Sequence, residues 1–150
     1  MSRAIDKLGF YQEPPAERGE TVLAAEFASD MALKQDWMGR ILEAIRGRWT
    51  ILPPEAKRIE PCLDEAIQNA IVWGTGKDPA KKVRFRLWSE DGRWGLTVHD
   101  EGLGFTKDAI PDYDSEEFLW QDHGRGIRIL LHYLSEVAYY DSGRTLVLKA

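Results

Sequence analysis

The sequence has one cysteine, few histidines and no excess of positive charge. Cys62 is the single cysteine among 150 residues, so neither an intramolecular disulfide nor a cysteine-rich metal site can form. The three histidines are too scattered for a recognisable zinc motif. A formal net charge of -5, with both signs mixed along the chain, argues against a surface that binds a nucleic-acid backbone. We therefore expect no nucleic-acid partner.

Long apolar runs are also missing. No stretch approaches the roughly 20 apolar residues that span a bilayer. The first residues, MSRAIDKLGF, lack the apolar segment of a secretory signal. These absences, together with the single cysteine, predict a cytoplasmic protein without a membrane partner.

What the sequence does contain is enough apolar material for one folded domain. Hydrophobic residues make up 43% of the chain and aromatic residues 11%, which suffices for a core in 150 residues. Residues 1–19 contain Pro14, Pro15 and Gly19 without a sustained period, and we interpret them as an extended or loosely ordered arm. Residues 20–150 form the predicted domain.

The first half of that domain predicts a strand and two helices. Residues 21–28 are typical of a strand, after which Ser29 or Asp30 is placed to cap a helix. That helix has an apolar residue every four positions: Leu33, Trp37, Ile41, Ile45 and Trp49. A second helix reaches about residue 72, with Pro61 in its first turn or at a kink, and Gly74 and Gly76 end it.

The second half predicts two hairpins separated by a helix. Residues 83–87 and 94–99 alternate as strands around an Asp91-Gly92 turn, and residues 136–140 and 145–149 form a second pair. A helix begins near residue 124, and an acidic, aperiodic lid is expected over residues 101–123. Segregated helices and hairpins predict an α+β two-layer sandwich with helices on one face of a mostly antiparallel mixed sheet.

Two polar residues stand on the second predicted helix. Glu65 and Asn69 are four positions apart, so their side chains share one side of the helix. At the border of an apolar face they can point into a cleft. An ordinary hydrogen-bonded pair at the helix edge is the alternative interpretation.

Two glycine motifs follow. Asp100 ends a strand before Gly102 and Gly104, where a carboxylate can accept a hydrogen bond from an exocyclic amine such as that of adenine, while the glycines allow close approach. Gly124 and Gly126 open the third helix, whose N-terminal amides favour phosphate. Alone, each motif is also compatible with a glycine-rich turn or a flexible connection into the core. The order and spacing of these motifs together suit the binding of a metal ion, a nucleobase and a triphosphate.

The same segments resemble a known superfamily. Residues 64–70 (DEAIQNA) resemble the N box, residues 100–105 (DEGLGF) the first glycine box and residues 124–127 (GRGI) the second glycine box of the superfamily of gyrase, mismatch-repair ATPases and sensor histidine kinases. Within it the sequence is most similar to the bacterial anti-sigma factor serine/threonine kinases of partner-switching systems. The resemblance covers about residues 20–150 and implies the Bergerat-type ATP-binding fold.

The resemblance implies a role for each matching residue. Asn69 would bind the magnesium ion that bridges the ATP phosphates, and Glu65 would be the general base for a serine or threonine hydroxyl. Asp100 would accept a hydrogen bond from the adenine amine. The remaining residues implied to contact the nucleotide are Gly102, Gly104, Phe105, Gly124, Arg125, Gly126, Ile127 and Thr145, of which Thr145 would close the adenine pocket.

The implied partners are a sigma factor and an anti-sigma factor antagonist protein, and a homodimer stays open. Trp73 stands where many of these kinases have histidine, and Arg144 where a glycine is common. A non-catalytic, ATP-gated binding module is therefore an alternative to a kinase. The detached catalytic half of a histidine kinase is another, although no long helix with a phosphoacceptor histidine precedes the N box in this sequence.

Overall fold

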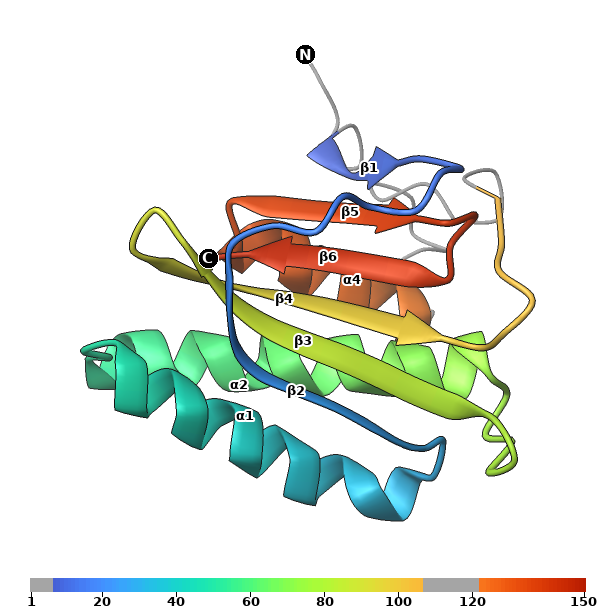
Figure 1. Cartoon of the computed structure of the whole chain (residues 1–150), viewed down its shortest axis with the longest axis horizontal. Helices are drawn as coiled ribbons and strands as arrows, with labels where there is room; N and C mark the ends of the chain where they lie inside the picture. The colour runs from blue at the N-terminus through green and yellow to red at the C-terminus, as the bar shows by residue number, and fades with distance from the viewer. Residues whose placement is uncertain (1–6, 107–121) are drawn as a thin grey trace.

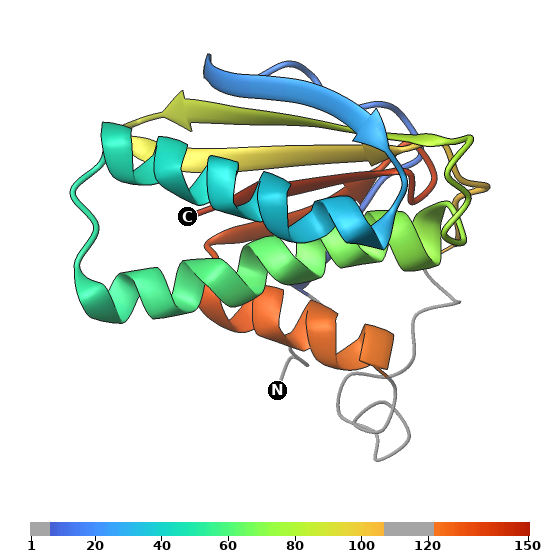
Figure 2. The same ribbon diagram turned by 90° about the horizontal axis from the view of Figure 1, so that it is seen from below.

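The computed structural model describes residues 7–106 and 122–150, with the side chains of the second segment described from Gly126 onward. Within these residues, three α-helices lie against one face of a six-stranded sheet (Figures 1 and 2). This arrangement confirms the predicted α+β sandwich. In chain order the elements are β1 (Gly9–Phe10), β2 (Glu20–Ala28), η2 (Met31–Leu33), α1 (Lys34–Arg48), α2 (Pro53–Gln68), η3 (Asn69–Gly74), β3 (Lys82–Glu90), β4 (Arg93–Asp100), α4 (Asp122–Tyr133), β5 (Glu136–Tyr140) and β6 (Thr145–Lys149).

The sheet has the order β1-β5-β6-β4-β3-β2, and every pair except the parallel β1-β5 pair is antiparallel. Both predicted hairpins are present. The β3-β4 turn places Asp91 and Gly92 at φ 55° and 74°, the left-handed values that a tight two-residue hairpin turn requires. The mixed, mostly antiparallel sheet follows from these local turns.

Alternation along the strands decides which residues face the helices. On β4, Leu96 and Val98 belong to the core beneath the helices, so Asp100 shares their face while His99 lies on the outer face. On β6, Leu146 pairs with Val98 and Thr145 pairs with His99. The end of β4 therefore presents a carboxylate to the helix side and an imidazole to the outer side.

The helix α1 buries the predicted apolar stripe. Ile41 and Ile45 are fully buried, and Trp37 stacks on Phe27 of β2. Of the two predicted caps, Asp30 accepts a hydrogen bond from the Ala32 amide at 2.9 Å, but it caps the short 3-10 turn η2 that precedes α1.

The helix α2 begins earlier than the sequence pattern suggested. Pro53 and Pro54 occupy its first positions, where a missing amide hydrogen costs nothing. Pro61 accordingly lies inside the helix, which excludes the first turn among the two positions that the sequence left open. After Gln68 the chain widens into the π-helical segment η3, which ends at Gly74 as predicted.

The described part of the N-terminal arm lies across the outer face of the sheet (Figure 1). Its two-residue strand β1 extends the sheet beside β5, which the sequence did not predict. Arg18 anchors the arm through hydrogen bonds to Glu90 and Glu136, and its guanidinium lies 5.0 Å from the centre of the Trp88 ring. The arm thus covers part of the face that carries no helix.

Among the described residues, no helix combines the length and the apolar character that crossing a membrane would require.

Candidate functional site

The C-terminal part of α2 brings the first two predicted residues into the molecule's interior. Glu65 is half-buried on α2, and Asn69, the first residue of η3, is 7% exposed. Neighbouring Ala66 and Ile67 are buried in the core and fix this part of the helix against the sheet. The two polar residues are therefore held by packing and not by solvent-exposed turns.

The first turns of α4 pack directly on Glu65. A Cβ atom added at Gly126 would lie 1.8 Å from Glu65 Oε2, so a side chain there would displace the carboxylate. Gly126 and Ile127 are both buried. The residues predicted as N box and second glycine box are thus in contact, although they are far apart in the sequence.

Asn69 has unused hydrogen-bonding capacity. Within the described part of the chain, neither its amide nitrogen nor its amide oxygen makes a well-formed hydrogen bond, and the same holds for the buried Tyr139 hydroxyl. Burial raises the pKa of Tyr139, and the nearby Asn69 amide partly offsets that rise. A buried, unsatisfied amide is unusual in proteins and needs a physical reason. A bound cation that takes the amide oxygen would supply one.

Asp100 is enclosed by two glycines. A Cβ atom at Gly74, the last residue of η3, would lie 2.4 Å from the Asp100 carboxyl group, and one at Gly102 would lie 1.9 Å from the Gly74 carbonyl oxygen. The Gly102 amide donates a hydrogen bond to Asp100 Oδ1 at 2.8 Å. The π-helical widening of η3, a feature that often marks functional sites, ends directly against this carboxylate.

The burial of Asp100 alters its acidity. Its side chain is 5% exposed, and this burial raises its pKa to about 6, although the Gly102 amide and the charge of Arg144 act in the opposite direction. Above that pH the carboxylate is ionised and can accept a hydrogen bond from a neutral donor such as an amine.

The loop after Asp100 is docked on the β5-β6 turn. Gly104 has φ 76°, and a Cβ atom there would lie 2.2 Å from the Ser142 carbonyl oxygen. The Phe105 amide donates to that same oxygen at 2.8 Å, and the Phe105 ring packs edge-on against Tyr139. Gly104 and Phe105 therefore hold the loop close to the turn.

These groups surround one small cavity. Its lining includes Asn69, Trp73, Asp100, Phe105 and Arg144, and it encloses about 20 Å³, which is room for about one water molecule. Trp73, one of the lining residues, is 52% exposed. A base can enter this space only if its walls move apart.

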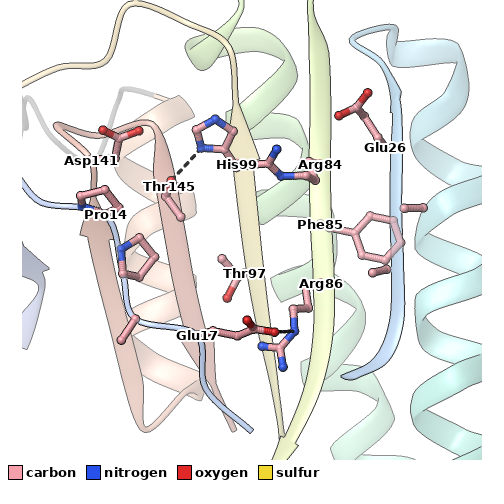
Figure 3. Close-up of a pocket in the computed structure, with 14 residues that line it drawn as sticks. Pro14, Glu17, Glu26, Arg84, Phe85, Arg86, Thr97, His99, Asp141 and Thr145 are labelled. Atoms are coloured by element: carbon pink, nitrogen blue, oxygen red, sulfur yellow. Dashed lines mark hydrogen bonds and ion pairs between the residues drawn. The ribbon is translucent and has the colours of Figure 1, made fainter. Parts of the chain in front are cut away.

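Thr145 lies elsewhere. Its hydroxyl is 2.8 Å from His99 Nδ1 on the outer face of the sheet, and Figure 3 shows both side chains at a separate groove of about 710 Å³. Asp141 also lines that groove, whereas Asp100 faces the helices. The structure thus brings together Glu65 with Gly126 and Asn69 with Asp100, but not Thr145 with Asp100.

Comparison with known proteins identifies the family of the chain. Residues 28–150 match the family model of the histidine kinase-like ATPase domain. The chain belongs to this family. Over 105 residues it is 32% identical to the anti-sigma F factors of Geobacillus stearothermophilus and of Geobacillus kaustophilus (strain HTA426), covering 63% of this chain and 68% of each relative. Over 101 residues it is also 32% identical to that of Geobacillus thermodenitrificans (strain NG80-2), with the same coverage.

As a member of the histidine kinase-like ATPase family, the chain uses ATP. The donors around the cavity suit the parts of that ligand: a buried carboxylate for an amine, and a buried amide oxygen for a hard cation such as Mg²⁺. Among the described residues no group of three or more histidine, cysteine or acidic side chains could hold a metal by itself. A magnesium ion at this site would therefore need oxygen ligands from the phosphates and water as well as from the protein.

Three residues of the site were missed by sequence reasoning. Gly74 was taken only as a helix end, and Tyr139 was taken only as part of a strand. Arg144 was noted as a departure from the family pattern, yet strand alternation from Leu146 already places it on the helix face beside Asp100.

Two parts of the predicted site lie outside the described residues. The helix α4 begins at Asp122 and so contains Gly124 and Arg125, but the surroundings of these two residues are not described. Residues 107–121 of the predicted lid are likewise outside the described ranges.

Proposed function

We propose that this chain is an ATP-binding anti-sigma factor that phosphorylates an antagonist protein on serine or threonine. The observation that carries the proposal is the meeting of Glu65, Asn69 and Asp100 with Gly74, Gly102 and Gly126 at one end of the sheet. The similarity to anti-sigma F factors supports the choice of two partners, which are a sigma factor and an anti-sigma factor antagonist.

In this proposal, the Asp100 carboxylate accepts a hydrogen bond from the exocyclic amine of adenine. The carboxylate is buried and ordered by the Gly102 amide, and a carboxylate in that setting discriminates in favour of a base with a donor. Glycine at positions 74 and 102 lets the backbone pack closely around the Asp100 carboxyl group that would contact the base.

Asn69 offers its amide oxygen to the magnesium ion. When bound, that ion would neutralise negative charge that develops during phosphoryl transfer. The amides at the start of α4 accompany it, because unpaired N–H groups at a helix N-terminus bind phosphate.

Glu65 acts as the general base. It removes the proton from the serine or threonine hydroxyl while that oxygen forms a bond to the γ-phosphorus. The bond between the γ-phosphorus and the bridging oxygen breaks, and ADP leaves with its electron pair. The position of Glu65 against the start of α4 puts a carboxylate beside the region assigned to the phosphates.

The test is a transfer assay with radiolabelled ATP, Mg²⁺ and the antagonist encoded in the same genome. We expect label on serine or threonine of the antagonist. Label that is lost in acid, as from phosphohistidine, would instead indicate the catalytic half of a histidine kinase. No label on any cognate antagonist would contradict the kinase assignment.

The second candidate is a non-catalytic, ATP-gated binding module. It is favoured by the fact that both departures from the family pattern, Trp73 and Arg144, line the cavity beside Asp100. This candidate predicts ATP binding and partner capture without turnover, and multiple rounds of phosphorylation would exclude it.

A further inference from the structure

Arg144 occupies a special position at the start of the last hairpin strand. Its carbonyl oxygen accepts a hydrogen bond from the Asp100 amide at 2.9 Å, which ties the end of β4 to the turn before β6. Its side chain is 36% exposed and reaches the loop that follows Asp100. Arg144 therefore contacts the proposed base pocket through both backbone and side chain.

The guanidinium group donates hydrogen bonds to three backbone carbonyl groups. Nε lies 3.0 Å from the Gly102 oxygen, Nη2 lies 3.1 Å from the Leu103 oxygen, and Nη1 lies 3.2 Å from the Asp141 oxygen. Two of these carbonyls belong to the loop after β4 and the third to the β5-β6 turn. One rigid side chain thus joins the two segments.

Between the anchored residues Gly102 and Phe105, the loop has no apolar anchor at Leu103. The Leu103 side chain is 88% exposed, so apolar packing does not hold this residue. Gly102 and Gly104 flank Leu103, and glycine has more backbone freedom to lose than any other residue. Backbone hydrogen bonds, among them those from Arg144, must therefore set the shape of the loop.

We propose that Arg144 is a positioning residue that ties residues 102–105 to the β5-β6 turn as one wall of the site that binds the base of ATP. This inference rests on the proposed ATP site and names a residue that the site was not expected to use. The three carbonyl groups are reached from three different nitrogen atoms of one planar, rigid guanidinium. A lysine ammonium keeps the charge and has three N–H donors, but all three radiate from a single nitrogen atom and cannot reproduce this planar arrangement.

The experiment uses the full chain and the variants Arg144→Ala and Arg144→Lys. Arg93→Ala, an exposed arginine at the opposite end of β4, is the matched control. Calorimetry measures the affinity for Mg·ATP and for Mg·tripolyphosphate, which has no base. Hydrogen exchange by NMR measures the Phe105 amide, which donates to Ser142.

We expect both Arg144 variants to bind ATP at least about tenfold more weakly. Their tripolyphosphate affinity should stay within about twofold of the wild type, and their Phe105 amide should exchange faster. Arg93→Ala should match the wild type in every measurement. If Arg144→Ala does not fold, Arg144→Lys alone decides the question.

Wild-type ATP affinity in Arg144→Lys would overturn the proposal, because charge alone would then suffice. Equal loss of ATP and tripolyphosphate affinity would also overturn it, since the effect would not be confined to the base. Unchanged exchange at Phe105 in the variants has the same consequence. A wild-type chain that binds no ATP would instead remove the proposed function itself.

Discussion

The two halves of the candidate site differ in how completely the protein satisfies its own polar groups. We call the first the base half, which consists of Gly74, Asp100, Gly102 and Arg144, and the second the phosphate half, which consists of Glu65, Asn69 and Gly126. In the base half, Asp100 and Arg144 both make hydrogen bonds to the neighbouring loop. In the phosphate half, the Asn69 amide makes none of good geometry with the described residues.

The difference teaches which half depends on a ligand. In the base half, the hydrogen bonds of Asp100 and Arg144 are made within the chain, so they exist before any nucleotide binds. The phosphate half contains a buried polar group that costs about 1–3 kcal/mol when left unsatisfied. Such a cost persists where function requires the group. The predictions that follow test each half in turn.

The largest effect is expected in the phosphate half, from Glu65→Gln. Loss of the general base should reduce phosphoryl transfer by about 10²–10⁴-fold while ATP affinity stays close to that of the wild type. A single-turnover transfer assay and an ATP titration measure the two quantities. Glu60→Gln, an exposed glutamate on the same helix, is the control and should retain activity. Transfer at the wild-type rate in Glu65→Gln would remove the base assignment.

In the base half, Asp100→Asn should weaken ATP binding by about 1.5–3 kcal/mol, roughly tenfold or more, because a charge-assisted hydrogen bond to the adenine amine is lost. The pKa of about 6 adds a pH dependence to the wild type. Affinity should fall as the pH drops from 7.5 through 6, since the protonated carboxyl is a weaker acceptor. Calorimetry at several pH values measures this, and a flat profile would contradict it.

The same substitution should stabilise the free protein. Burial raises the pKa of Asp100 from 3.8 to about 6, so the native state binds more protons than the unfolded chain between these values. In the wild type, the protonated Asp100 carboxyl therefore contributes its full stability below about pH 4. The wild type loses this contribution, about 3 kcal/mol, as the pH rises through 6 and the buried carboxyl ionises. Asp100→Asn lacks this loss, and urea unfolding should show its advantage at pH 7.5 and none near pH 4.

A smaller effect on stability is expected from Asn69→Leu in the phosphate half. Removing the unsatisfied amide should raise the free energy of unfolding without nucleotide by about 1 kcal/mol. The variant should also lose the part of its ATP affinity that depends on Mg²⁺, which titrations with Mg²⁺ and with EDTA separate. Gln68 is the neighbouring amide, and its oxygen accepts a hydrogen bond from Lys34. The control variant Gln68→Leu should therefore keep the Mg²⁺ dependence. Unaltered Mg²⁺ dependence in Asn69→Leu would exclude Asn69 as a ligand.

Most of the fold could be predicted because its signals are local. The Asp91-Gly92 turn fixes the register of β3 and β4, and the four-residue period from Leu33 to Trp49 identifies α1. The strand β1 could not be predicted, since two residues carry no measurable period and their pairing with β5 depends on tertiary contacts. For Pro61 the sequence left open the first turn or a kink, because the local pattern did not fix where α2 begins, and the structure has it inside the helix.

The candidate site likewise contains residues that the sequence predicted and residues that it did not. Asn69 and Asp100 were predicted from their spacing, and the structure places both at one cavity. The spacing gave no sign that Gly74 packs on the Asp100 carboxyl or that Gly126 packs on Glu65, because close contacts between distant segments have no local pattern. Arg144 was within reach of sequence reasoning, since counting back by two from Leu146 assigns its face.

The smallest effect is expected from Thr145→Val, outside both halves. The family resemblance assigns Thr145 to the adenine pocket, whereas its hydroxyl contacts His99 on the outer face of the sheet. Valine has nearly the same shape and lacks only the hydroxyl, so ATP affinity should change by less than about twofold if the outer face takes no part in binding. A loss of tenfold or more in calorimetry would show that the base reaches Thr145, and it would shift the boundary of the base half across the strand.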